Sequence, residues 1–99
     1  MKLIIIKWRD IPTQVMIKKS RKEVEKVQLD TRFMEAVDSA ATIAGTTDTD
    51  AYLSEWNNEV IEIPDGNMKE LVVSKVAELD SEFTLNVLLD YINNEGYKP

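Results

Sequence analysis

The sequence predicts an α+β fold: a small three-stranded sheet, made of an N-terminal β-hairpin and one later strand, packed by three or four helices in the order ββααβα(α). Two patterns support this class. Near the N-terminus apolar residues alternate with a period of two, and later they recur every three or four positions. A chain of 99 residues, 43% of them hydrophobic, is long enough for one core. We therefore expect residues 1–99 to form a single globular domain.

The first predicted element is the hairpin. Residues 2–8 form a β-branched run with apolar side chains on both faces, which is typical of a strand that is covered on both sides. Residues 9–12 interrupt the run with a charged pair and a proline, and residues 13–18 then alternate between apolar and polar side chains. We expect a four-residue turn at residues 9–12 and a second strand with one face toward water.

The next segment predicts a basic connection followed by a helix. Residues 18–28 are mostly polar, with at most a short extended piece near residues 27–29. Asp30 or Thr31 can cap a helix whose apolar positions recur on one face, and Gly45 supplies its end. The apolar face is rich in alanine, so we expect this helix to lie close to the sheet.

Two further elements precede the C-terminal helical region. A shorter helix is predicted to begin near residues 47–49 and to end at Asn57-Asn58. Residues 59–63 alternate in the manner of a third strand, and Pro64-Asp65-Gly66 closes it as a turn.

The C-terminal region predicts one or two helices. Asn67 precedes Glu70 by three residues, a spacing that resembles a capping box, and a long apolar series follows without Gly or Pro until Gly96. This series fits either one long helix or two helices broken near Asp80 or Thr84. The break is favoured, because both residues are good caps and a helix of about thirty residues is unusual in so small a domain.

The amino-acid composition limits the catalytic and metal-binding chemistry that this chain can perform. The chain has no Cys and no His, which removes disulfides, thiolate metal sites and the nucleophilic triads that need His. We expect no cofactor and no metal site, and a protein that is not an enzyme. Catalysis is not excluded, because Lys, Asp, Glu and Tyr remain as proton carriers.

The lengths of the apolar runs indicate where in the cell the protein is expected. No apolar run approaches the roughly 18 residues of a transmembrane helix, and the run at residues 3–6 is too short for a signal-peptide core. We therefore expect a cytoplasmic protein with no membrane partner.

Charge is divided unequally along the chain. Residues 1–33 hold nine Lys or Arg against four Asp or Glu, a net charge of +5, whereas the remainder holds three against fourteen, a net charge of −11. Such asymmetry indicates an anionic partner or a dipolar molecule that pairs with another protein. Nucleic acid is disfavoured, because the overall charge of −6 repels a polyanion and no aromatic residues alternate with the basic ones.

Two segments are candidate binding sites. The run from Lys18 to Lys22 follows a strand directly and could hold a phosphate or another anion through its cations and the Ser20 hydroxyl. The alternative is a solvated loop that pairs loosely with nearby acids.

The second candidate segment is Trp8-Arg9-Asp10-Ile11-Pro12. It could form a recognition tip, since Trp and Arg are favoured interface anchors. The alternative is a turn in which Asp10 binds local backbone amides while Trp8 covers the sheet edge.

Several short motifs occur in a fixed order along the chain. They are Trp8-Arg9-Asp10-Ile11-Pro12, Gln14-Val15, the Lys19/Arg21/Lys22 cluster, Arg32-Phe33, and Asp50-Ala51-Tyr52-Leu53 with Glu55-Trp56. Over residues 2–75 the chain therefore resembles the small bacterial and archaeal family labelled "virulence factor", which is similar to a domain of the conserved virulence factor C proteins of staphylococci. The resemblance implies neither catalytic residues nor a cofactor. The chain departs from the usual pattern at Thr13, where Ala is common, and at Ser20, where Gly is common.

Two functional hypotheses follow. The first is a non-enzymatic accessory domain whose basic hairpin and loop surface binds an acidic or phosphorylated protein partner. The second is a domain that binds a small phosphate-bearing metabolite. The sequence leaves the oligomeric state open. In either case the candidate binding residues are Trp8, Arg9, Asp10, Gln14, Lys18, Lys19, Arg21 and Lys22.

Overall fold

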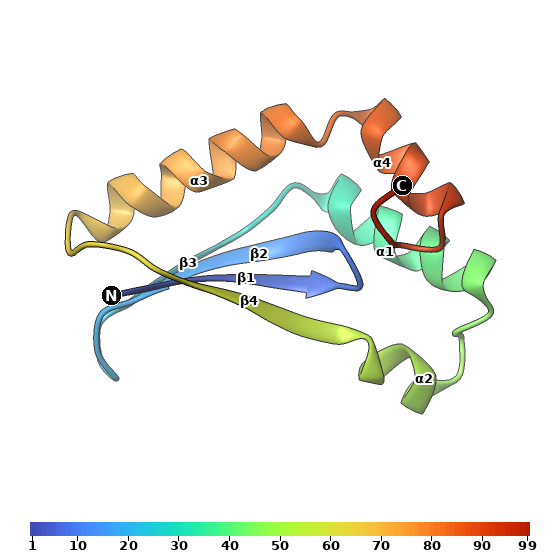
Figure 1. Ribbon diagram of the computed structural model, residues 1–99, viewed down its shortest axis with the longest axis horizontal. Helices are drawn as coiled ribbons and strands as arrows, with labels where there is room; N and C mark the ends of the chain where they lie inside the picture. The colour runs from blue at the N-terminus through green and yellow to red at the C-terminus, as the bar shows by residue number, and fades with distance from the viewer.

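The computed structural model describes all 99 residues as one antiparallel sheet with four helices (Figure 1). The sheet has four strands in the order β3-β2-β1-β4. The α+β class is confirmed, but the predicted count of three strands is wrong. The elements are β1 Lys2–Trp8, β2 Ile11–Lys18, β3 Val24–Gln28, α1 Thr31–Ala44, α2 Thr49–Ser54, β4 Trp56–Glu62, α3 Met68–Glu82 and α4 Leu85–Asn93.

Strand β3 lies where the sequence predicted a basic connection. It pairs antiparallel with β2 and forms one edge of the sheet. Its only apolar residues are Val24 and Val27, because an edge strand with a solvent-exposed side needs few. Pairing with β2 therefore specifies this strand more strongly than its own composition does.

The β1–β2 turn is shorter than predicted. Strand β2 already begins at Ile11, so only Arg9 and Asp10 lie between the strands, instead of four residues. Arg9 adopts a φ of 52°, in the left-handed region that tight two-residue turns use. Pro12 pairs with Lys7 within the ladder, whereas Thr13 forms a bulge between that pair and the pair Ile6–Gln14.

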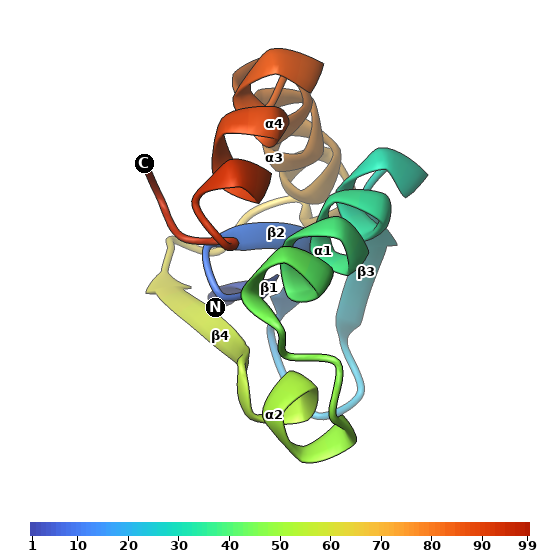
Figure 2. The ribbon, with the colours of Figure 1, turned by 90° about the vertical axis from the view of Figure 1, so that its right-hand side faces the viewer.

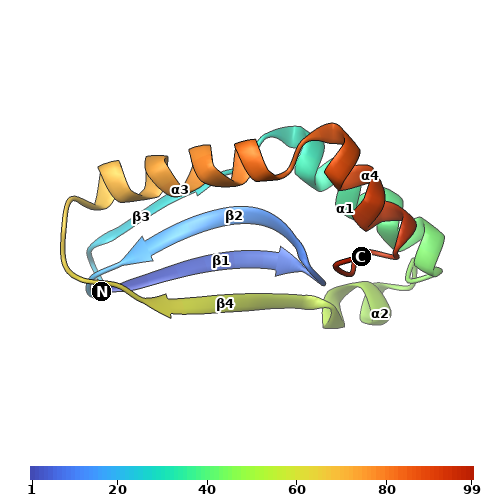
Figure 3. The ribbon, with the colours of Figure 1, turned by 45° about the horizontal axis from the view of Figure 1, so that its top comes forward.

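Helix α3 lies along one face of the sheet, called here the inner face (Figure 3). Leu3, Ile5, Val15 and Ile17 point to this face and are buried. On the opposite, outer face Ile4 and Ile6 are only half-buried. The expectation that β1 is covered on both sides is thus met on the inner face and only in part on the outer one.

The remaining helices gather at the end of the sheet where β1 turns into β2 (Figure 2). Helix α1 begins at the cap Asp30 and ends at Gly45 with φ 72°, as predicted. Its buried alanines let it pack closely against α4 and β2. Phe33 of α1 meets Phe83, which follows α3, at a ring separation of 5.9 Å.

Helix α2 ends earlier than predicted, at Ser54, and β4 begins earlier, at Trp56. Tyr52 and Trp56 are four residues apart and so resemble one helical face. Trp56 instead pairs with Trp8 across the β1–β4 ladder, because strand pairing overrides the local pattern.

The C-terminal series forms two helices, as favoured. The Asn67 side chain accepts a hydrogen bond from the Glu70 amide at the start of α3. Thr84 interrupts the series, and its hydroxyl accepts a hydrogen bond from the Val87 amide at the start of α4. None of the four helices is both long enough and apolar enough to cross a bilayer.

Candidate functional site

The β2–β3 loop is held in a tight shape by two hydrogen bonds. The amide of Lys19 donates to the carbonyl of Glu23 at 3.0 Å, and the amide of Glu23 donates to the hydroxyl of Ser20 at 3.2 Å. The loop thereby turns the chain between two paired strands while the side chains of Lys18 to Lys22 remain exposed. In Figure 1 this loop lies at the same end of the sheet as the N-terminus.

This loop forms one side of a cleft of about 490 Å³. We call it the basic cleft. Strand β1 contributes the Lys2 side chain, because Lys2 pairs with Lys18 in the β1–β2 ladder. The same residue pairs with Glu62 in the β1–β4 ladder, so three strands meet here. The residues that line the basic cleft are Met1, Lys2, Ile4, Lys18, Lys19, Ser20, Arg21, Val60 and Glu62.

The basic cleft has a strongly positive lining with an apolar floor. Its side chains include four cations and a single carboxylate, that of Glu62. None of these four cations takes part in an ion pair within the chain. Ile4 and Val60 are cross-strand partners on the outer face, and Val60 is 53% exposed. Such a cleft can hold an anionic group next to an apolar one.

The hairpin tip, defined as Trp8 to Pro12, is enclosed within the fold. Trp8 is fully buried, and its indole Nε1 donates a hydrogen bond to the carbonyl of Tyr52 at 3.0 Å. The Tyr52 ring stacks on the indole at a centroid separation of 5.9 Å. In this conformation Trp8 covers the core and does not face solvent.

Arg9 and Asp10 bind the C-terminal segment. The Arg9 guanidinium lies between the rings of Trp8 and Tyr97, at 5.0 and 4.6 Å from the two centroids, and its Nη1 donates to the carbonyl of Glu95. Its Nε lies 3.5 Å from a carboxylate oxygen of Glu55, an ion pair without hydrogen-bond geometry. The Asp10 carboxylate accepts a hydrogen bond from the Lys98 amide at 2.8 Å.

The eight candidate residues thus occupy three places. Lys18, Lys19 and Arg21 line the basic cleft, whereas Lys22 is exposed in the same loop outside its lining. Trp8, Arg9 and Asp10 belong to the hairpin tip at the other end of β1. Gln14 lies half-buried on the outer face, where it pairs with Ile6 and Gln28.

Sequence reasoning missed the contributions of β1 and β4 to the basic cleft. A usable signal existed for Lys2, since the hairpin register places it opposite Lys18. None existed for Val60 and Glu62, because the pairing of β1 with β4 joins residues about sixty positions apart.

Two tyrosines near the hairpin tip, at the end of the sheet opposite the basic cleft, have raised pKa values. Burial raises the pKa of Tyr91, and the negative charges of Glu82 and Asp10 raise it further. Burial also raises the pKa of Tyr52, with a smaller contribution from Asp38. Both shifts favour the neutral, protonated form of the phenol. No group of three or more acidic side chains is placed to hold a metal ion.

Comparison with known proteins places the chain in a family. The family model described as "Virulence factor" matches residues 6–91, which include the hairpin tip, the β2–β3 loop and most of the helical part. No curated protein and no solved structure matches the chain.

Proposed function

The chain belongs to the virulence factor family, and we propose that it is a non-enzymatic interaction module whose basic cleft binds an acidic or phosphorylated segment of a partner protein. One observation carries this proposal. Four cations of the basic cleft face one carboxylate and have no ion-pair partner within the chain. Exposed like charges repel one another, and an anionic partner relieves that repulsion.

The shape of the basic cleft favours a peptide segment. Its apolar floor at Ile4 and Val60 continues onto the outer face, where Ile6 and Met16 are half-buried. An acidic or phosphorylated side chain can bind the cations while neighbouring apolar side chains of the segment cover this floor. Clustered Lys and Arg recognise phosphorylated motifs in the same way.

The charge distribution of the whole chain supports this orientation. The acidic remainder of the molecule repels an anionic partner, whereas the basic end attracts it. The partner is thereby steered to the end of the sheet that carries the β2–β3 loop.

The test is affinity capture from the native lysate, at low and at roughly physiological salt. The variant Lys19→Glu/Arg21→Glu reverses two cations of the basic cleft. The control Lys69→Glu/Lys98→Glu makes the same change in net charge outside it. We expect a partner that is retained by the native protein and the control and lost with the cleft variant, provided that circular dichroism shows all three folded. Capture in which no partner is lost with the cleft variant would contradict the proposal.

A second candidate function is the binding of a small phosphate-bearing metabolite. The bounded volume of about 490 Å³ and the Ser20 hydroxyl in the lining favour it. A thermal-shift screen with nucleotides and sugar phosphates separates the two, because a metabolite that binds the folded protein raises the melting temperature. A rise that disappears in Lys19→Glu/Arg21→Glu would favour the metabolite over the protein segment.

A further inference from the structure

Helix α3 covers only half of the inner face of the sheet. It contacts β2 and β3, and the inner-face side chains Leu3 and Ile5 of β1 are buried at its margin. Strand β4 lies beyond its cover, and its inner-face residue Ile61 is 37% exposed (Figure 3). Neighbouring strands are about 4.8 Å apart, and packed helices are about 8–10 Å apart, so one helix covers about two strands. A second helix beside α3 would complete the layer, but the chain places α1 and α4 at the end of the sheet instead (Figure 2).

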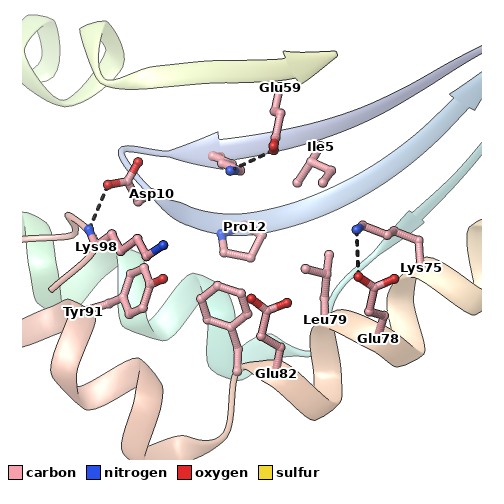
Figure 4. A pocket seen from close by; sticks show the side chains of 12 residues that line it. Ile5, Asp10, Pro12, Glu59, Lys75, Glu78, Leu79, Glu82, Tyr91 and Lys98 are labelled. Carbon is pink, nitrogen blue, oxygen red and sulfur yellow. Dashed lines mark hydrogen bonds and ion pairs between the residues drawn. The ribbon is translucent and has the colours of Figure 1, made fainter. Parts of the chain in front are cut away.

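The uncovered half forms a groove with two adjoining hollows, of about 400 and 580 Å³. Lys75 and Glu78 of α3 line both hollows and so mark where they join. Leu3 and Ile5 of β1 form the floor together with Ile61 of β4. Figure 4 shows the hollow nearer the C-terminus, where side chains of α3 point toward the strands. We call the whole feature the acidic groove.

Apolar side chains remain exposed on both sides of the acidic groove. Ile61 on the floor and Leu71 on the wall are each 37% exposed. They belong to different elements and face the same hollow. A partner that covered them would gain the free energy of burying apolar surface on two sides at once.

The charges of the acidic groove specify the kind of partner. Its lining holds six carboxylates and three lysines. Lys7 is paired with Glu59 at 3.1 Å, and Lys75 is paired with Glu78 at 3.1 Å. Glu70 and Glu82 of α3 have no ion-pair partner. The groove therefore complements a segment that is apolar on one side and basic on its flanks.

We propose that the acidic groove binds a basic, amphipathic α-helix of a partner protein, which lies beside α3 over β1 and β4. A helix fits the acidic groove better than a strand does, because both hollows lie between α3 and the inner face, whereas an added strand would pair outside them at the edge of β4. A second copy of this chain fits poorly, since all of its helices except the first turn of α1 lie in the part with a net charge of −11. A helix as long as α3, 15 residues, reaches about 22 Å and spans both hollows.

The first test is selection from a displayed library of random 16-residue peptides, with the native protein as bait at roughly physiological salt. We expect enriched peptides with apolar residues at helical spacing and Lys or Arg on the remaining positions, and a gain of helicity on binding by circular dichroism. Basic peptides that alternate with a period of two, or no enrichment of basic peptides, would each overturn the proposal, whereas acidic peptides are those expected at the basic cleft.

The second test locates the binding with a matched pair of variants. Ile61→Gln/Leu71→Gln removes apolar surface from the acidic groove without changing charge. Ile43→Gln/Val73→Gln removes exposed apolar surface elsewhere, at residues 52% and 62% exposed. For the selected peptide we expect the groove variant to bind at least tenfold more weakly and the control to bind within twofold of the native protein, with both variants folded by circular dichroism. Equal effects of the two variants would overturn the proposal.

Analytical ultracentrifugation of the native protein tests whether a second copy of this chain, and not a partner helix, fills the acidic groove. We expect a monomer in which the groove variant changes nothing. A dimer that the groove variant dissociates and the control does not would show that a second copy fills the acidic groove, contrary to the proposal.

Discussion

The two loops that flank β2 carry similar residues and lie at opposite ends of the sheet. The hairpin tip precedes β2 and holds Arg9, whose side chain is 9% exposed and lies between two aromatic rings. The β2–β3 loop follows β2 and holds Arg21, which is exposed and has no ion-pair partner. Local sequence does not distinguish a structural cation from one that is free to bind.

The difference comes from segments that are remote in sequence. The hairpin tip receives Glu55 from the end of α2, together with Gly96 and Tyr97 from the C-terminal segment. No helix covers the β2–β3 loop. Contacts made by the hairpin tip therefore stabilise the fold, whereas cations of the β2–β3 loop remain available to a partner.

The largest effect is expected when the hairpin tip loses its indole. Trp8→Ala removes a fully buried side chain and its hydrogen bond to Tyr52, and we expect the free energy of unfolding to fall by about 3–5 kcal/mol. Urea denaturation measures it. Trp8→Phe provides a milder variant if the alanine variant does not fold, and Val60→Ala, at an exposed position, is the control. A loss below about 1 kcal/mol for Trp8→Ala would show that the tip is not a core element.

A smaller loss is expected at the contact between the C-terminal segment and the hairpin tip. A Cβ at Gly96 would lie 2.8 Å from Cζ3 of Trp8, and the backbone there has φ 91°. We expect Gly96→Ala to lower the free energy of unfolding by roughly 2–4 kcal/mol, from backbone strain and steric overlap together. The matched control is Gly45→Ala, where φ is 72° but no atom lies within 4 Å of the added Cβ.

Gly45→Ala causes backbone strain but no steric overlap. The difference between the two variants in the free energy of unfolding therefore measures the overlap with Trp8. Thermal unfolding of both variants gives this difference. If Gly45→Ala and Gly96→Ala were equally destabilising, the C-terminal segment would not be packed tightly on the hairpin tip.

The smallest effects compare the two arginines directly. Arg9→Gln removes a cation from between two rings and a hydrogen bond to Glu95, and we expect a loss of about 1–2 kcal/mol. Arg21→Gln should change stability by less than about 0.5 kcal/mol, because its side chain is exposed and unpaired. Urea denaturation of the two variants, measured side by side, gives the two losses in the free energy of unfolding. If Arg21→Gln lost as much as Arg9→Gln, the two loops would not differ in the way described.

The parts of the fold that local chemistry determines were predicted from the sequence. The caps at Asp30 and Asn67, the left-handed end at Gly45 and the break at Thr84 all depend on residues within a few positions of one another. Strand β3 and the start of β4 at Trp56 were not predicted. Both depend on hydrogen bonds to a neighbouring strand, so their own residues carry little signal.

The candidate site divides in the same way. The exposed cations of the β2–β3 loop follow from composition and a tight turn, and so the sequence could indicate them. The burial of Trp8 could not be decided, because it depends on Tyr52 and Gly96, which are far away in the chain. The acidic groove was not foreseen either, since it exists only because α3 lies over β2 and β3 and not over the middle of the sheet.

The bulge at Thr13 determines where this hairpin can change length in evolution. Thr13 has no ladder partner on β1, although its hydroxyl donates a hydrogen bond to the Ile6 carbonyl at 3.0 Å. The pairs on its two sides, Ile6–Gln14 and Lys7–Pro12, are already those of a regular ladder. If Thr13 were removed, every other side chain of β2 would still point to the same face of the sheet. An insertion or deletion at another position of β2 would move the neighbouring side chains to the opposite face. Two hydrogen bonds would be lost: the one that the Thr13 hydroxyl donates to the Ile6 carbonyl, and the one that the Thr13 carbonyl accepts from the Leu29 amide. Relatives with shorter or longer hairpins should therefore differ at Thr13 or within the β2–β3 loop, and not along the paired residues between them.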